Sequence, residues 1–275
     1  MYPGMKLKEK LLECQQNKTA LLATNFYNFE TLRAVLEAAK ATDSSIILQL
    51  TRSSIEYMGL ETAVSMGRAG LKHYGVQGWI HLDHGDSKEL VEKCLHAGFD
   101  SVMIDGSELP IEQNIELTRK VVNLSKPFDV NVEAELGYVA KLGQDEGKVD
   151  YTRPEDVKRF VDETWIDALA VAIGTAHGFY KETPKLDFER LKAIRKITDV
   201  KLVLHGSSGV PDESIRRAIK LGICKVNLAT EIKNAFMKNL KMTLNETDEI
   251  DLRKVFPVAI SSVRELIKYK LQLMR

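Results

Sequence analysis

The stretch from Ile80 to Gly85 places two histidines and an aspartate at the end of an apolar run. It reads I-H-L-D-H-G, and the residues from Gly78 onward are typical of a short buried strand. Alternation along a strand would send Asp83 and His84 to opposite faces unless the backbone turns where the strand ends. There the pair could supply a metal ligand and a separate acid–base group to one site. The simpler interpretation is that the pair only caps the next helix.

Other apolar runs of the chain also end in polar residues, and together with the first stretch they place three histidines at such ends. His84, His177 and His205 are three of the six histidines in the chain. Three neutral imidazoles with one open coordination position suit a catalytic Zn²⁺ ion, although each histidine alone could simply bond within its own loop. The remaining polar ends are Asn25, Thr51, Asp105, Glu135 and Asn227.

The elements that must position these residues form a repeating pattern of a short apolar run followed by an amphipathic helix. Continuous apolar runs are typical of parallel strands buried on both faces, and the carboxyl ends of such strands surround the active site of a barrel. We therefore predict an α/β fold, a single (β/α)8 TIM barrel over residues 1–275 with extra C-terminal helices, and keep a doubly wound open sheet as the alternative. The expected strands are 20–23, 45–50, 78–84, 101–104, 130–135, 168–173, 202–204 and 223–226. The expected helices are 30–40, 61–74, 87–96, 112–124, 154–164, 186–197, 211–221 and 231–275, the last interrupted mainly at Pro257.

Two turns after the last two strands have the composition of a phosphate site. Gly206-Ser207-Ser208-Gly209 precedes a helix opened by Pro211, and Asn227-Leu228-Ala229-Thr230 precedes another helix. Backbone amides in such turns bind phosphate, and these two loops are the usual phosphate site of a TIM barrel. Together with the histidines, they indicate a metal-dependent enzyme that acts on a phosphorylated small molecule.

Composition excludes several other classes of protein. Apolar residues make up 44% of the 275 residues, and 39 basic residues balance 39 acidic ones, so no charge surplus favours nucleic acid or a membrane surface. Cys14, Cys94 and Cys224 are widely spaced, which is typical of a reducing compartment. Residues 1–10 lack the apolar core of a signal peptide. We expect a cytoplasmic protein.

The ordered motifs at the strand ends resemble those of the class II, zinc-dependent ketose-bisphosphate aldolases, on the branch of tagatose- and fructose-bisphosphate aldolases. The similarity covers residues 21–230. It is carried by H-L-D-H-G (81–85), S-V-M-I-D-G-S (101–107), V-E-A-E-L-G (132–137), A-V-A-I-G-T-A-H-G (170–178), L-V-L-H-G (202–206) and K-V-N-L-A-T (225–230).

The resemblance implies a role for each of these positions. His84, His177 and His205 would bind the catalytic zinc, Asp105 and Glu135 an alternative or second metal position. Asp83 would be the acid–base group for the C4 hydroxyl. Dihydroxyacetone phosphate would be held by Gly178, Gly206, Ser208 and Asn227 to Thr230, which include Leu228 and Ala229, with Na⁺ or K⁺ near the phosphate. Asn25, Thr51 and Ser207 complete the expected substrate-binding set.

The chain departs from the family pattern in two places that affect this expectation. The segment 138–147 reads Y-V-A-K-L-G-Q-D-E-G and is longer than usual, so either Asp145 or Glu146 would be the proton donor carried by this loop. Ser207 replaces a usual glycine, which would strain the phosphate turn if that position needed a positive φ.

The reaction that we expect is the reversible cleavage of tagatose or fructose 1,6-bisphosphate to dihydroxyacetone phosphate and glyceraldehyde 3-phosphate. The alternatives are an aldolase for another sugar phosphate, a metal-binding relative without aldol activity, and a zinc hydrolase. A homodimer or homotetramer is implied, with Arg52, Ser53 or Arg264 of a neighbouring subunit as ligands of the distal phosphate. The apolar stripe Val263, Leu266, Ile267 and Leu271 fits either an oligomer contact or packing on the barrel.

Overall fold

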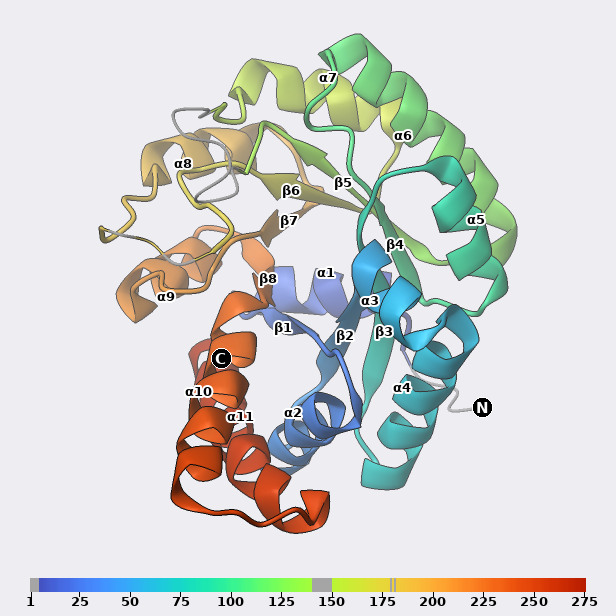
Figure 1. Ribbon diagram of the computed structural model, residues 1–275. Coiled ribbons are helices and arrows are strands. Elements are labelled where there is room, and N and C mark those ends of the chain that lie inside the picture. Colours follow the sequence, from blue (N-terminus) through green and yellow to red (C-terminus); the bar gives the residue numbers. More distant parts are fainter. Residues whose placement is uncertain (1–4, 140–149, 179, 181) are drawn as a thin grey trace.

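A closed barrel of eight parallel strands forms the centre of the molecule (Figure 1). The computed structural model describes residues 5–139, 150–178, 180 and 182–275. Each strand pairs with the next in sequence, and β1 pairs with β8 to close the barrel, which confirms the TIM barrel and rules out the open sheet. The strands are β1 Leu21–Asn25, β2 Ile46–Leu50, β3 Gly78–Gly85, β4 Ser101–Ile104, β5 Asn131–Leu136, β6 Ala168–Val171, β7 Lys201–Leu204 and β8 Ile223–Leu228.

Helices surround the barrel in the order that the sequence predicts. Ser87 caps α5, because its hydroxyl accepts a hydrogen bond from the Leu90 amide at 3.4 Å. None of the described helices has the length and apolar character needed to cross a membrane. The helices are α1 Leu7–Asn17, α2 Phe29–Ala41, α3 Arg52–Met58, α4 Leu60–Tyr74, α5 Lys88–His96, α6 Ile111–Ser125, α7 Pro154–Thr164, α8 Phe188–Ile197, α9 Asp212–Lys220, α10 Thr230–Glu246 and α11 Leu252–Leu273, with a 3₁₀ turn at Lys126–Phe128.

Two helices, α1 and α3, were not predicted. In α1, Leu7, Leu11 and Cys14 recur at the spacing of one helical face, and all three are buried. They pack with Ile47 and Trp79 of the strands in a second, smaller hydrophobic cluster. Because α1 precedes β1 and supplies these side chains, it covers the amino-terminal end of the barrel, opposite the predicted site.

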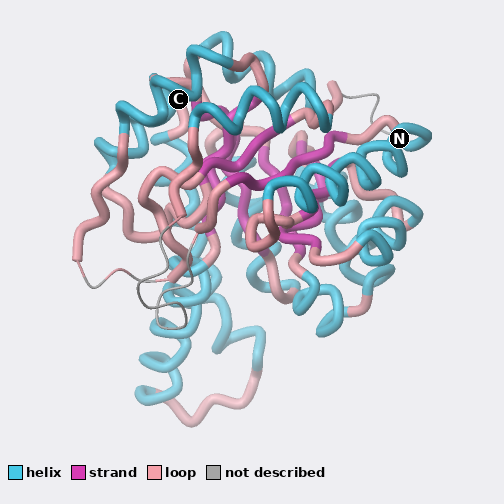
Figure 2. Tube along the Cα trace, turned by 90° about the horizontal axis from the view of Figure 1, so that it is seen from above, coloured by secondary structure: helices cyan, strands magenta, loops and turns pink. Residues whose placement is uncertain are grey.

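The C-terminal part is helical as predicted, but its interruption is not at Pro257. The break lies at residues 247–251, and Pro257 is inside α11. Buried neighbours on both sides of the proline, Val255 and Ala259, hold this part of α11 in place, so the loss of one backbone hydrogen bond does not end the helix. Figure 2 shows that α10 and α11 form an antiparallel pair whose connecting loop extends away from the barrel.

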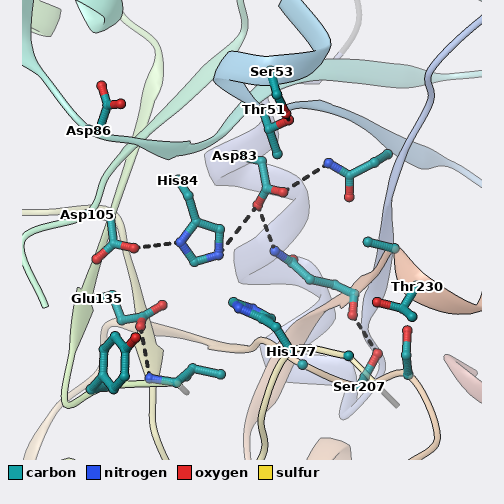
Figure 3. A pocket seen from close by; sticks show the side chains of 18 of the residues that line it. Thr51, Ser53, Asp83, His84, Asp86, Asp105, Glu135, His177, Ser207 and Thr230 are labelled. Carbon is teal, nitrogen blue, oxygen red and sulfur yellow. Dashed lines mark hydrogen bonds and ion pairs between the residues drawn. The ribbon is translucent and has the colours of Figure 1, made fainter. Parts of the chain in front are cut away.

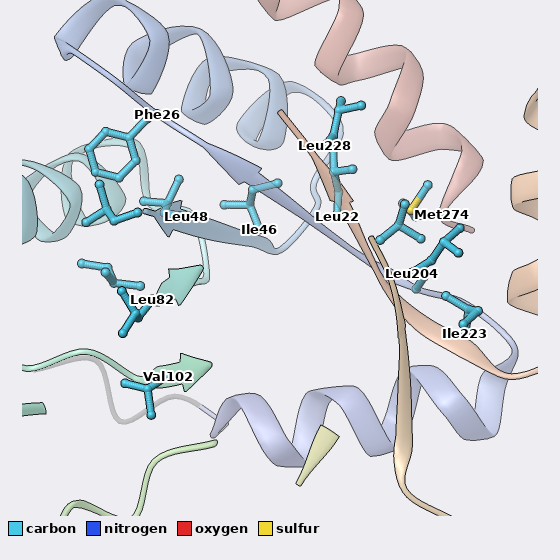
Figure 4. Packing of buried hydrophobic residues seen from close by; sticks show 14 of the residues in the cluster. Leu22, Phe26, Ile46, Leu48, Leu82, Val102, Leu204, Ile223, Leu228 and Met274 are labelled. Atoms are coloured by element: carbon cyan, nitrogen blue, oxygen red, sulfur yellow. The ribbon is translucent and has the colours of Figure 1, made fainter. Parts of the chain in front are cut away.

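The main hydrophobic core lies between the outer faces of the strands and the surrounding helices. Leu22, Leu48 and Leu82 of the first three strands belong to this core (Figure 4). In α11, Val263 and Ile267 are fully buried and the helix contacts α2 and β1, so the C-terminal apolar stripe packs on the barrel. Successive side chains of a strand point to opposite faces, so polar residues such as Gln49 and Glu133, which neighbour the outward-facing Leu48 and Val132, point into the barrel. There they can build a site.

Candidate metal centre and active site

A break in strand regularity turns both Asp83 and His84 towards the mouth of the barrel. The pairing of β3 with β4 shifts register between Leu82 and Gly85, and His84 has φ +50°. A left-handed backbone at a residue other than glycine is strained and is tolerated when its surroundings fix it. Gly85 has to lack a side chain because a Cβ there would collide with the Met103 carbonyl oxygen.

A cavity of about 680 Å³ at the carboxyl ends of the strands collects most of the predicted site residues (Figure 3). His205 is buried beside this cavity. The Leu228 side chain packs in the hydrophobic core, so the expected contact of Leu228 with substrate would come from its backbone. Asp145 and Glu146 lie outside the described residues. The predicted residues that line the cavity are Asn25, Thr51, Asp83, His84, Asp105, Glu135, His177, Gly178, Gly206, Ser207, Ser208, Asn227, Ala229 and Thr230.

The three predicted histidines meet at the base of this cavity. One potential ligand atom from each of His84, His177 and His205 lies within 4.8 Å of the others, and a second set of His84, Asp105 and Glu135 meets the same limit. Asp105 Oδ2 is 2.6 Å from His84 Nδ1, which leaves His84 Nε2 for the centre of the cluster. Three imidazole nitrogens flanked by two carboxylates fit a zinc ion by number and chemistry of donors.

His205 differs from the other two histidines because both of its ring nitrogens contact a carboxylate. Nδ1 is 2.9 Å from Glu135 Oε2, and Nε2 is 2.9 Å from Glu133 Oε1. Burial lowers the pKa of His205, but the bonds to Glu133 and Glu135 outweigh it and raise the pKa above the usual 6.5. Without a metal, this imidazole is therefore stabilised in its cationic form.

The pKa values of the other two cluster histidines move in opposite directions. Burial disfavours the charged form of His84, but the hydrogen bond to Asp105 and the charge of Asp83 raise its pKa to about 10. Burial, together with the neighbouring charges of His84 and His205, lowers the pKa of His177 to about 3. A metal ion that binds this cluster would thus displace protons from His84 and His205, whereas His177 is already neutral and can bind the metal directly.

Asp83 is held by three carboxamide side chains from different strands. Asn25 donates to Oδ2 at 2.9 Å, while Gln49 and Asn227 donate to Oδ1 at 3.2 Å each. Burial would raise the pKa of Asp83, but the charges of His84 and His205 and the Asn25 bond lower it below 3.8. Asp83 is therefore an ionised carboxylate of fixed orientation.

Within the described part of the chain, the amide oxygens of Gln49 and Asn227 are the unsatisfied parts of this arrangement, and of these two residues Asn227 lines the cavity. Among the described residues, Oδ1 of Asn227 is buried without a hydrogen-bond partner, although the residue lines the cavity. A buried acceptor without a partner costs free energy, so a hydroxyl group of a bound ligand would stabilise it. The side of the cavity next to Asp83 is therefore suited to a ligand hydroxyl group.

Three residues of the site region were missed by the sequence analysis. Gln49 bonds to Asp83, Glu133 bonds to His205, and Lys225 bonds to Glu133. Each is a polar residue inside an otherwise apolar strand, and all three are fully buried. Buried polar groups require partners, so a polar residue within an apolar run was the available signal.

The predicted phosphate turn is fixed to its neighbours by hydrogen bonds. The Ser207 hydroxyl donates to the carbonyl oxygen of Asn227 on β8. Tyr180 accepts a bond from the Ala176 amide at 2.6 Å and donates to the Gly206 carbonyl at 2.8 Å. Gly206 has φ +66°, whereas Ser207 is not among the residues with positive φ, so a serine fits there without backbone strain.

Thr51 has a structural contact in addition to its place in the cavity. Its side-chain oxygen accepts a bond from the Ser54 amide at 3.3 Å and caps α3. The cap brings Ser53, which also lines the cavity, to the same rim. Thr51 and Ser53 therefore lie together beside the mouth, where a ligand would enter.

The same fold occurs in proteins of known class. A family model described as class-II fructose-bisphosphate aldolase matches residues 5–275. The YdjI aldolase from Escherichia coli K12 is 31% identical with a TM-score of 0.87, over 98% of this chain and 96% of that chain. A Coccidioides immitis structure, proposed to be a fructose-1,6-bisphosphate aldolase, is 26% identical with a TM-score of 0.89, over 98% and 96% of the two chains. The Campylobacter jejuni aldolase Fba shares the fold at 23% identity, with a TM-score of 0.84 over 98% and 95%.

These matches agree with the closed barrel of this chain. The chain belongs to the class II fructose-bisphosphate aldolase family. It is an aldolase, a lyase that cleaves a carbon–carbon bond, of a family whose members are generally metal-dependent.

Proposed function

We propose that this aldolase uses Zn²⁺ to cleave a ketose 1,6-bisphosphate, tagatose or fructose, reversibly into dihydroxyacetone phosphate and glyceraldehyde 3-phosphate. The observation that carries the proposal is the position of an ionised carboxylate beside three clustered imidazoles. Asp83 Oδ1 lies 4.0 Å from His84 Nε2, the nitrogen that faces the cluster. The carboxylate would supply a base, and a zinc ion held by the imidazoles would supply an electrophile, to the same substrate.

His84, His177 and His205 would hold the zinc ion, and Asp105 and Glu135 would orient these ligands or offer an alternative position. When bound, zinc supplies charge stabilisation for the enediolate that carbon–carbon cleavage leaves behind. Asp105 already keeps the proton of His84 on Nδ1 by its short hydrogen bond.

Asp83 would remove the proton from the C4 hydroxyl during cleavage and return it during condensation. Its three carboxamide donors orient the carboxylate, and its lowered pKa keeps it ionised at neutral pH. The free Oδ1 of Asn227 would accept a bond from a substrate hydroxyl. Together these contacts position the C3–C4 bond for cleavage.

Protonation of the enediolate needs a second acid, and we propose Asp145 or Glu146 for it. Two variants, Asp145→Asn and Glu146→Gln, separate the candidates. The variant that loses the acid should fail to exchange a C3 proton of dihydroxyacetone phosphate with deuterated solvent, because this exchange requires no C4 chemistry. Normal exchange in both variants would contradict the assignment.

The phosphate of dihydroxyacetone phosphate would bind between the turn after β7 and the start of α10. Gly178, Gly206 and Ser208 line this side of the cavity together with Ala229 and Thr230. Backbone amides and the positive end of a helix dipole favour an anion there. A monovalent cation, Na⁺ or K⁺, would balance the phosphate charge.

A second candidate is an aldolase for a ketose 1-phosphate, and the charge of the cavity favours it. Among the described lining residues, Lys233 is the only lysine or arginine. Arg52 already pairs with Asp86, and Arg264 pairs with Glu37 at 3.5 Å, so a distal phosphate would have to compete for either. A neighbouring subunit could supply Arg52, Ser53 or Arg264 instead.

We further propose a homodimer or homotetramer in a reducing cytoplasm. The three cysteines are free and buried, which fits such a compartment. Light scattering coupled to size-exclusion chromatography measures the oligomer directly. A monomeric mass would contradict the proposed assembly and any phosphate ligand from a neighbouring subunit.

The decisive experiment measures release of dihydroxyacetone phosphate from tagatose and fructose 1,6-bisphosphates and from the matching 1-phosphates. Each assay is repeated with a chelator and after zinc is added back. Cleavage that disappears with chelator and returns with zinc would support the proposal, and the rate ratios would assign the C4 configuration and the need for a distal phosphate. Failure on the bisphosphates with zinc bound would refute the bisphosphate assignment.

A further inference from the structure

A fully buried ion pair lies beside the histidine cluster, away from the cavity. Lys225 Nζ donates to both oxygens of Glu133, at 2.7 and 3.0 Å. Glu133 Oε1 also accepts from His205 Nε2 at 2.9 Å, and all three side chains are 0% exposed. Neither member of the ion pair lines the cavity. A buried pair is costly to desolvate, so it does not by itself explain stability.

The position of Glu133 assigns separate tasks to the two nitrogens of His205. Glu133 precedes Glu135 by two residues on β5, so it lies about 6.6 Å deeper along the strand. Nδ1 of His205 faces Glu135, which lines the cavity, whereas Nε2 faces the deeper Glu133. Nδ1 is therefore the nitrogen that a metal in the cluster can reach.

The neighbours of Lys225 fix the direction of each hydrogen bond in this network. An ammonium group can only donate, so His81 Nε2, 3.3 Å from Lys225 Nζ, has to be an acceptor. The proton of His81 is then on Nδ1 and points to Ser101 Oγ at 2.7 Å, which also accepts from Asn131 at 3.0 Å. With Lys225 donating to both its oxygens, Glu133 is an ionised acceptor for the Nε2 proton of His205.

We propose that Glu133 and Lys225 are a positioning pair for the metal ligand His205. Glu133 keeps the proton on Nε2, orients the ring and makes Nδ1 a stronger ligand, as outer carboxylates do for metal-bound histidines. Lys225 keeps Glu133 ionised and in place. This inference rests on the proposed zinc site and assigns two residues that do not contact the substrate.

The environment of Lys225 also argues against covalent use of its amine. A lysine that forms an imine has to reach the substrate with a neutral amine, but Lys225 Nζ is bound to a carboxylate outside the cavity lining. Treatment with dihydroxyacetone phosphate and borohydride should leave Lys225 unmodified in a mass spectrum. A reduced adduct at Lys225 would overturn the positioning role.

The test uses the charge-neutral double variant Glu133→Gln with Lys225→Met. It removes both charges, so no buried ion is left unpaired. The carboxamide oxygen of the glutamine introduced at position 133 can still accept the hydrogen bond from His205 Nε2. Zinc affinity, measured by competition with a chromogenic chelator, should fall about 10- to 100-fold. Ser101→Ala is the matched control, because it removes a buried hydrogen bond of the same network without touching His205. A double variant that binds zinc as tightly as the wild type, or a control that loses as much, would overturn the proposal.

A second measurement uses the unaltered protein and does not depend on how the variants fold. Nitrogen-15 NMR of the zinc-loaded wild type should show His205 bound through Nδ1, with a slowly exchanging proton on Nε2. Zinc on Nε2 would overturn the inference. A wild type that binds no zinc at all would instead refute the proposed metal site, and with it this role. Tight zinc binding without bisphosphate cleavage would refute only the proposed substrate.

Discussion

Asp83 and His84 are adjacent in sequence, yet their side chains point into the same cavity, with Oδ1 and Nε2 4.0 Å apart. In a regular strand they would face opposite sides. The register shift after Leu82 and the left-handed backbone of His84 bring them together. The proposed acid–base group and a proposed metal ligand thus come from one strand end, which requires the glycine at position 85.

Replacing Asp83 by asparagine should abolish cleavage while the metal remains bound. The introduced carboxamide has the size of the carboxylate but cannot accept a proton, so kcat should fall about 10²- to 10⁴-fold. Zinc content is measured in parallel, and Asp162→Asn on the exposed face of α7 is the control for a simple loss of charge. Activity within tenfold of the wild type would show that another group is the base.

Replacing Gln49 by leucine should shift the pH dependence of cleavage. The Gln49 amide donates a hydrogen bond to Asp83 Oδ1 at 3.2 Å, which favours the ionised carboxylate, so its loss should raise the pKa of Asp83. The acidic limb of kcat/KM should therefore move up by about one pH unit. Thr24→Val is the matched control, because its buried hydroxyl has no partner among the described residues. An unshifted limb would mean that Gln49 does not act on the base.

The stability of the metal-free protein should have a maximum close to pH 6.5. His84 has a raised pKa of about 10, so its contribution is complete below 6.5 and is lost as the pH rises through 10. His81 and His177 have pKa values lowered to about 3, so stability also falls as the pH drops below 6.5. Thermal melts in the presence of chelator measure both limbs. His84→Gln should flatten the alkaline limb, and an unchanged limb would contradict the assignment.

Metal binding should release protons at neutral pH. The raised pKa values of His84 and His205 favour their charged forms in the metal-free protein, and zinc requires both as neutral ligands. We expect proton release on zinc binding at pH 7, with His84 as its main source, and an affinity that rises with pH. Titration in weak buffer with an indicator dye counts these protons. Binding without proton release would mean that the two imidazoles are already neutral.

Replacing Ser207 by alanine should weaken phosphate binding with a small loss of stability. The variant loses the hydroxyl bond to the Asn227 carbonyl, which ties the turn after β7 to β8. The free energy of unfolding should fall by about 1 kcal/mol. The inhibition constant of inorganic phosphate should rise several-fold. Ser207→Gly, with the glycine typical of the family, separates the role of this bond from backbone freedom, and unchanged inhibition in both would remove Ser207 from the phosphate site.

The chain order of the elements could be predicted because it depends on local patterns. Apolar runs and helical periodicity located all eight strands, and the polar residue at each strand end marked the mouth. The prediction failed where a local signal was misjudged. Pro257 favours a helix break, which tertiary packing prevents. The spacing of Leu7, Leu11 and Cys14 is typical of a helix and is the signal for α1, which the prediction lacks.

The sequence by itself determined the barrel, the residues at its mouth and the type of chemistry that they support. Only the tertiary structure decided how these residues are partnered. Asp83 meets Gln49 across 34 positions of sequence, and Glu133 meets Lys225 across 92. Such contacts depend on the register and closure of the barrel, which no local period encodes. For the same reason, the sequence could name His205 as a candidate ligand but could not show that its Nδ1 faces Glu135 and its Nε2 faces Glu133.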